Sequence, residues 1–234
     1  MNVRTSSFTS GPIRLALSGV LFPAFFFIGE NVAGRLATAS LPMPDAPVAE
    51  VVAYYSGSQS AALVLATFQA LSAVALLVFA TCVVLFLRRI PVDRGALVQV
   101  TRGAGILAGL FLLASAILAL ALTQAAAGGD PTLVGTLRSL NFLTGGTLHV
   151  ASLGVFVGAA SLAARRVGAL PGWIAWLGIL QALVSVLSLA SLFFYYAALF
   201  ILLGRLLGFV WCVAVCVALA VGRRPAPAAA ALGR

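Results

Sequence analysis

The side chains best suited to chemistry in this chain are a few polar residues inside long apolar stretches. Glu30, Gln69, His149 and Arg205 each lie about 24 to 28 Å from the arginine that flanks their stretch, counting about 1.5 Å per helical residue. Ionisable groups inside a membrane are costly and usually face a bundle interior or a wet cavity with a partner. If these stretches span a membrane, we expect the four residues at similar depth, with Glu30 and Arg205 as a pair.

Helical periodicity adds two polar faces to this set. Asn141 and His149 share one face of residues 141–152, and Gln181 begins a similar face over residues 181–191. In this arrangement Arg205 would meet an anionic headgroup, and His149 would give or accept a hydrogen bond. The pattern predicts a polar ligand pocket in the outer third of the membrane, bordered by Glu30, Gln69, Asn141, His149, Gln181 and Arg205.

A second interpretation gives these residues no ligand. Their common height would then be the outer headgroup boundary, where Glu30, Gln69 and Arg205 are hydrated in any case. His149 and the serines of residues 181–191 would only bond neighbouring helices, as polar side chains in membrane helices commonly do. The sequence leaves both interpretations open.

The sequence lacks the signatures of the common enzyme classes. A single histidine, His149, and no HExxH pattern argue against a zinc hydrolase or an intramembrane metalloprotease. No GxSxG pattern or phosphate-binding glycine loop is present, and the predicted cytosolic loops are too short for a catalytic domain. We therefore predict no catalytic residue, no metal and no cofactor, and we expect that the protein is not an enzyme.

The composition requires a membrane around these residues. The chain is 62% hydrophobic and only 8% charged, with a mean hydropathy of +1.15, whereas soluble domains carry about 25% charged residues. The net charge of +9 comes from arginines beside apolar stretches, which set orientation and contact anionic headgroups. We expect membrane lipids as partners and no nucleic acid.

The charge-free stretches predict an all-α bundle of six transmembrane helices in residues 12–222. The expected spans are about 13–33, 62–88, 103–127, 140–164, 171–191 and 199–222. An outer loop, 34–61, should contain a short interfacial helix, and residues 1–11 and 223–234 should be disordered. In an alternative interpretation residues 1–39 are a signal peptide, which would leave five spans.

The distribution of arginine predicts the orientation of the bundle. Eleven of the fourteen arginines fall in the termini and in alternate loops, including the pairs 88–89, 165–166 and 223–224. The opposite loops hold only Arg35 and Arg138, together with four of the five acidic residues. The positive-inside rule therefore places both termini in the cytosol.

Small residues at four-residue spacing indicate close helix packing in three spans. Such pairs let two helices approach closely, either within one bundle or across a homodimer seam. The pairs are Gly105 with Gly109, Gly154 with Gly158, and Gly204 with Gly208. We expect packing within one bundle and keep a homodimer through one of these glycine faces as an alternative.

Four apolar segments carry a resemblance to known proteins. They are residues 13–29, 48–79, 170–178 (LPGWIAWLG) and 208–221. With them the chain resembles the uncharacterised integral membrane proteins with six helices, a domain of unknown function, that are common in actinobacteria. The resemblance implies a six-span bundle in a bacterial cytoplasmic membrane and brings no catalytic residues.

The combined expectation is a binding or accessory protein without enzymatic activity. Its outer-third pocket would accept a lipid or another amphipathic small molecule. One alternative is a small-molecule or lipid transporter or exporter that uses Glu30 for proton coupling. A second is a structural or regulatory partner of another membrane protein.

Overall fold

The computed structural model describes residues 17–43, 45–90 and 95–220, and within these ranges the chain folds into helices without any strand. The termini predicted to be disordered, 1–11 and 223–234, lie outside the described residues, as does the predicted start of the first span. The elements are α2 (Ser18–Leu36), α3 (Val48–Gly57), α4 (Gln59–Arg89), α5 (Ala96–Gly128), α6 (Pro131–Phe142), η1 (Leu143–Leu148), α7 (His149–Arg166), α8 (Gly172–Leu187), η2 (Ser188–Leu192), η3 (Tyr195–Ala197) and α9 (Ala198–Ala220). The predicted all-α class is confirmed.

Five helical segments are long and apolar enough to cross a membrane. They are Gln59–Arg89, Ala96–Gly128, Pro131–Arg166, Gly172–Leu192 and Ala198–Ala220. These five segments are compatible with a multi-pass membrane protein. The remaining long helix, α2, is not among these five, and Glu30, Asn31 and Arg35 fall in its last two turns.

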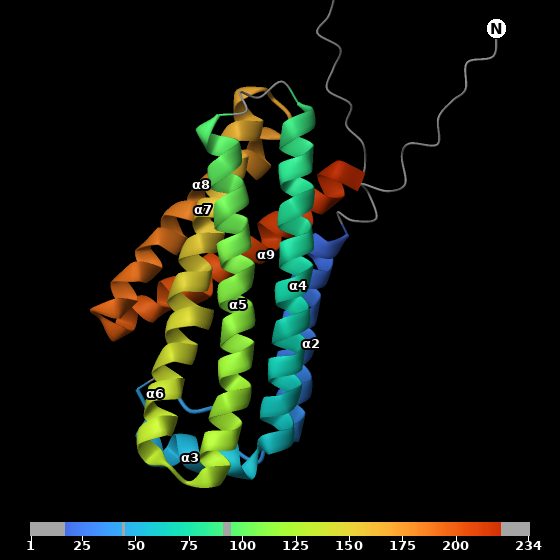
Figure 1. Cartoon of the computed structure of the whole chain (residues 1–234). Helices are drawn as coiled ribbons and strands as arrows, with labels where there is room; N and C mark the ends of the chain where they lie inside the picture. Colours follow the sequence, from blue (N-terminus) through green and yellow to red (C-terminus); the bar gives the residue numbers. More distant parts are fainter. Residues whose placement is uncertain (1–16, 44, 91–94, 221–234) are drawn as a thin grey trace, which may run out of the picture.

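The long helices pack largely in chain order. α2 lies against α4, α4 against α5, α5 against α7, and α7 against α8, while α9 contacts α8, α7 and α2. Figure 1 shows α4, α5 and α7 side by side, with α8 and α9 crossing the bundle obliquely. Because α8 and α9 are tilted, the turn that joins them ends part of the way along the bundle and not at the end covered by α3.

Aromatic rings and small residues fill the centre of the bundle. Trp211 is fully buried, and its ring centroid lies 6.2 Å from that of Phe79 and 5.9 Å from that of Phe156. The predicted glycine pairs all face helices of the same chain: a Cβ atom at Gly105, for example, would lie 2.8 Å from Ala80 Cβ. Close packing of this kind stabilises helix association in lipid, where the hydrophobic effect supplies little.

α4 and α5 are longer than a bilayer core is thick, and α3 packs against one end of the bundle as a small cap. α4 has 31 residues and α5 has 33, which gives lengths of about 46 to 50 Å against about 30 Å of hydrocarbon. At the end opposite the α4–α5 connection, Val51 of α3 packs on Leu122 and Val134. Burial there raises the pKa of Tyr55 to about 12. α3 is thus held against the bundle by an apolar contact.

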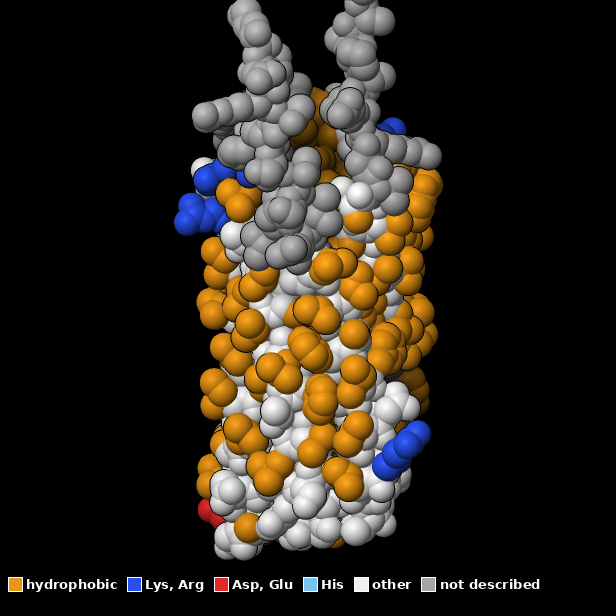
Figure 2. All heavy atoms as spheres, turned by 90° about the vertical axis from the view of Figure 1, so that its right-hand side faces the viewer, with side chains coloured by type: hydrophobic (Ala, Val, Ile, Leu, Met, Phe, Trp, Pro, Cys, Tyr) orange, Lys and Arg blue, Asp and Glu red, His pale blue; other side chains and the backbone are white. Residues whose placement is uncertain are grey.

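The surface of the molecule is compatible with a membrane protein. Figure 2 shows a broad band of hydrophobic side chains on the face that it presents, with basic side chains toward both ends of the band and an acidic side chain at the lower end. Exposed leucine, isoleucine and valine side chains occur along all the long helices of the described chain. A surface of this kind is suited to lipid and not to water.

Candidate functional site

Two of the predicted site residues meet in one hydrogen-bond network. Gln69 Nε2 of α4 donates to Ser115 Oγ of α5 at 2.9 Å. Asn141 Nδ2 of α6 donates to the Ser115 carbonyl at 2.7 Å and to Ser115 Oγ at 3.2 Å. The network joins three helices through Ser115, a residue that the sequence pattern did not single out.

A π-helical segment, η1, continues directly from this network. Its sequence, LTGGTL, interrupts the α-helical path between α6 and α7. Gly145 lies so close to α5 that a Cβ atom there would overlap Ser115 Oγ and would lie 2.7 Å from Ser115 Cβ. π-Helical segments free backbone carbonyl groups and are frequent at functional sites. The Gly145 carbonyl accepts a short hydrogen bond from Arg205 Nη2 of α9.

Arg205 therefore lies between three elements. Its guanidinium carbon is 5.0 Å from the ring centroid of Phe26 on α2, in addition to the bond to Gly145 of η1. Glu30 lies on an exposed part of α2, near enough for its charge to interact with that of Arg205. In the described part of the chain the two side chains form no direct ion pair. The structure brings the expected partners into one region without the expected contact.

The other two predicted residues join neighbouring helices. His149 is fully buried, and its Nδ1 lies 2.9 Å from the Ala108 carbonyl of α5, so that Nδ1 carries the donated proton. Gln181 Nε2 donates to Ser185 Oγ at 2.8 Å and to the Gly204 carbonyl at 3.1 Å, which links α8 to α9. Both arrangements match the interpretation in which polar side chains bond adjacent helices.

An open groove lies beside this network. Its volume is about 670 Å³, within the range of small-molecule sites. It is bounded by α6 and η1 on one side, by the α8–α9 turn at one end and by the start of α3 at the other. The lining residues are Val48, Gly135, Arg138, Ser139, Phe142, Leu143, Ser191, Leu192 and Phe193.

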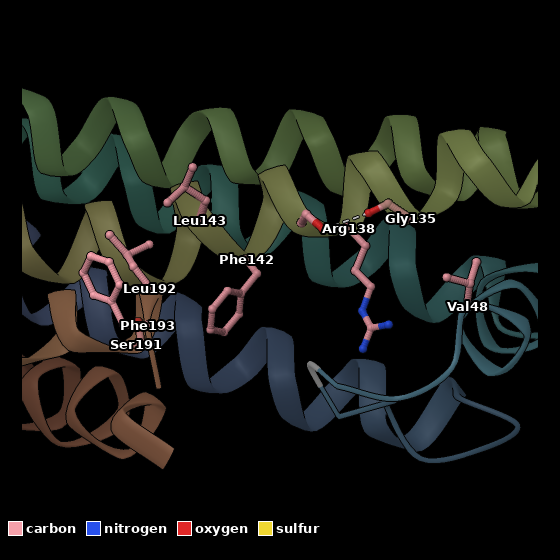
Figure 3. A pocket seen from close by; sticks show the side chains of 9 residues that line it. Val48, Gly135, Arg138, Phe142, Leu143, Ser191, Leu192 and Phe193 are labelled. Atoms are coloured by element: carbon pink, nitrogen blue, oxygen red, sulfur yellow. Dashed lines mark hydrogen bonds between the residues drawn. The ribbon is translucent and has the colours of Figure 1, made fainter. Parts of the chain in front are cut away.

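The groove combines one cation with an apolar surface. Figure 3 shows Arg138 and Phe142 projecting from α6 toward the same side, with Leu192 and Phe193 beyond Phe142 and Val48 at the opposite end, near Arg138. Arg138 Nη1 donates to the Ala46 carbonyl at 2.6 Å, and Nη2 donates to the Met43 carbonyl. These acceptors are neutral carbonyl groups, so they do not compensate the positive charge of the guanidinium.

None of the six residues predicted from the sequence lines this groove. The nearest link is η1, because Leu143 lines the groove while Gly145 bonds Arg205. Thr147 of η1 is also bonded to Ser191 of the groove at 3.0 Å. The predicted residues thus lie outside the groove, and Arg138 and Phe142 are the residues that the sequence pattern missed.

Among the described residues, no three His, Cys, Asp or Glu side chains come together in a group that could hold a metal ion. The comparisons add no family: no family model, curated protein or solved structure matches this chain.

Proposed function

We propose that this chain is a non-enzymatic, multi-pass membrane protein that binds a lipid or another amphipathic small molecule with an anionic group. The observation that carries the proposal is the 670 Å³ groove with Arg138 at one end and aromatic and aliphatic side chains along the rest. A guanidinium recognises carboxylate or phosphate through charge-assisted hydrogen bonds. An apolar chain attached to that group would lie over Phe142, Leu192 and Phe193.

The proposed topology has six spans, with both termini in the cytosol of a bacterium and the bundle in its cytoplasmic membrane. α2 is added to the five apolar segments as the first span of the chain. Its 19 residues reach about 28 Å, close to the thickness of the hydrocarbon core. The distribution of arginine in the sequence supports the orientation. Membership in the actinobacterial family that the chain resembles remains part of this proposal.

In this topology the groove opens in the outer half of the membrane. Arg138 follows the α5–α6 turn, on the side that carries four of the five acidic residues. Glu30 and Arg205 do not line the groove, and in this proposal they do not contact the ligand. This keeps the expected outer pocket but moves its cation from Arg205 to Arg138.

The test is native mass spectrometry of the full-length protein released gently from membranes. We expect a discrete bound mass in the wild type that is lost in Arg138→Ala and retained in Arg35→Ala, which removes a charge at the same end but outside the groove. Arg138→Lys separates two roles, since it keeps the charge but loses the paired donors to Met43 and Ala46. Bare protein in every sample, or equal bulk lipid in every sample, would refute the proposal.

A transporter is the second candidate, favoured by one observation. The π-helical segment η1 faces the 3₁₀ segment η2 through the bond between Thr147 and Ser191, and interrupted helices often adjoin transported substrates. This function predicts substrate flux in proteoliposomes that responds to a proton gradient and disappears in Glu30→Gln. Stable binding without flux would leave the binding function alone.

A further inference from the structure

A second groove lies at the opposite end of the bundle, between α4 and α5. Its volume is about 290 Å³, and it is separate from the groove beside α6. Two arginines from different helices line it. Arg88 lies near the end of α4, which ends at Arg89, and Arg102 lies near the start of α5, which begins at Ala96. The lining residues are Ala80, Thr81, Val84, Leu85, Arg88, Arg102 and Ile106.

The packing of α4 on α5 explains the position of this groove. The two helices approach closely at Gly105, where a Cβ atom would lie 2.8 Å from Ala80 Cβ and 3.0 Å from Phe156 Cδ2. That contact faces the interior of the bundle. The groove lies on the other side of the pair, where Leu85 is 43% exposed and Ile106 is 41% exposed.

The two arginines carry charge that the described residues do not neutralise. Arg88 and Arg102 are both exposed. Within residues 17–43, 45–90 and 95–220 neither guanidinium has a hydrogen-bond or ion-pair partner. A pair of guanidinium groups at the mouth of an apolar groove presents an attractive site for one phosphate.

We propose that this α4–α5 groove binds one anionic phospholipid of the adjacent leaflet. Arg88 and Arg102 contact the phosphate, and one acyl chain lies along Val84, Leu85 and Ile106. Basic grooves between transmembrane helices are known to suit acidic lipid headgroups. A soluble anion would leave the exposed Leu85 and Ile106 uncovered, so the surface fits a phosphate that carries a hydrocarbon chain.

The experiment titrates the purified full-length protein in detergent with phosphatidylglycerol or with phosphatidylcholine of the same chains. Bound lipid is counted by native mass spectrometry. We expect the first phosphatidylglycerol to bind the wild type about thirtyfold more tightly than phosphatidylcholine, given about 1 kcal/mol for each of the two arginines near an anionic headgroup. Arg88→Ala with Arg102→Ala should abolish that preference.

The matched control is Arg89→Ala with Arg166→Ala, which removes the same charge from two exposed arginines outside the groove. The control variant should keep the preference. An equal loss in both double variants would reduce the effect to general surface charge and overturn the proposal. Equal binding of the two lipids to the wild type would overturn it as well.

Two further arms test the lipid chain. Ile106→Trp fills the groove and keeps both arginines, so it should weaken phosphatidylglycerol binding while the thermal melting of the protein stays unchanged. Glycerol phosphate, which has the anionic group without the chains, should fail to compete at the same concentration. Effective competition would identify a site for soluble phosphate and would refute the lipid.

Discussion

Substitution of Gly145 by alanine tests whether the network around Ser115 holds the outer half of the bundle together. The new methyl group would overlap Ser115 Oγ and would lie 2.7 Å from Ser115 Cβ, so η1 and α5 must separate. Overpacking of this kind costs about 1 to 3 kcal/mol. Separation also weakens the bonds from Gln69 and Asn141, each worth about 0.6 kcal/mol in membrane helices.

A small gain opposes these losses, since replacing glycine by alanine in a helix favours folding by about 0.5 to 1 kcal/mol. The net destabilisation should be about 2 kcal/mol. For a chain of this size that lowers the melting temperature by about 4 to 8 °C. The assay is thermal unfolding of the purified protein in detergent, followed by circular dichroism.

Two variants make the prediction specific. Gly103→Ala is the matched control, because no atom from beyond its own turn of helix lies within 4 Å of the added Cβ, and its melting temperature should stay the same or rise. Ser115→Gly removes both overlapping atoms, so Gly145→Ala should cost almost nothing in that background. The coupling between the two sites should therefore be about 2 kcal/mol. Additive effects of the two substitutions would show that the proposed overlap does not cause the loss.

Two other predictions concern the ends and the centre of the bundle. Because burial raises the pKa of Tyr55 to about 12, above the usual value near 10, the contribution of Tyr55 to stability is complete below pH 10 and is lost as pH rises toward 12; absorbance titration should show a late tyrosine ionisation that Tyr55→Phe removes. Trp211→Ala should leave a cavity against Phe79 and Phe156 and cost about 3 to 5 kcal/mol by thermal unfolding, whereas Trp211→Phe should cost less.

The helical class could be predicted because charge-free stretches have a length set by the bilayer. The limits of the helices could not, since they depend on where the chain leaves the bundle. The helix predicted over 140–164 begins at Pro131, after Asp130 accepts hydrogen bonds from the backbone of Thr132 and Leu133. That cap uses local chemistry that a search for apolar stretches ignores. The added turns carry Arg138 into a helix.

The polar residues were predicted in part. Glu30 and Arg205, which were paired by their similar depth, lie near each other, and Gln69 and Asn141, which were both assigned to the predicted pocket, share one network. Depth alone does not determine which atoms meet, and so Ser115 and the Gly145 carbonyl were missed as partners. The adjacent glycines of the LTGGTL segment were the available signal, because small residues permit both close approach and a π-helical turn.

The groove beside α6 could not be derived from periodicity, because it results from the tilt of α8 and α9 against the other helices. A pattern along one helix records which face is apolar but not the angle at which a neighbour crosses it. The turn after α8, which contains Ser191, lies beside Phe142 because of this tilt. The groove therefore gives Arg138 a second role. From the sequence it was counted only as a loop charge that bears on orientation, whereas beside the groove it is the cation that a ligand would contact.

The same geometry explains why Arg138 is better placed than Arg205 to bind a ligand. Arg205 is half-buried and is held by the Gly145 carbonyl and the Phe26 ring. Arg138 is held by two loop carbonyls and still borders open space. Of the two arginines, only Arg138 lines the groove, so it is the better placed to bind an incoming anion. The wall formed by η1 then fixes the shape of the site, because Leu143 lines the groove two residues before the glycine that anchors Arg205.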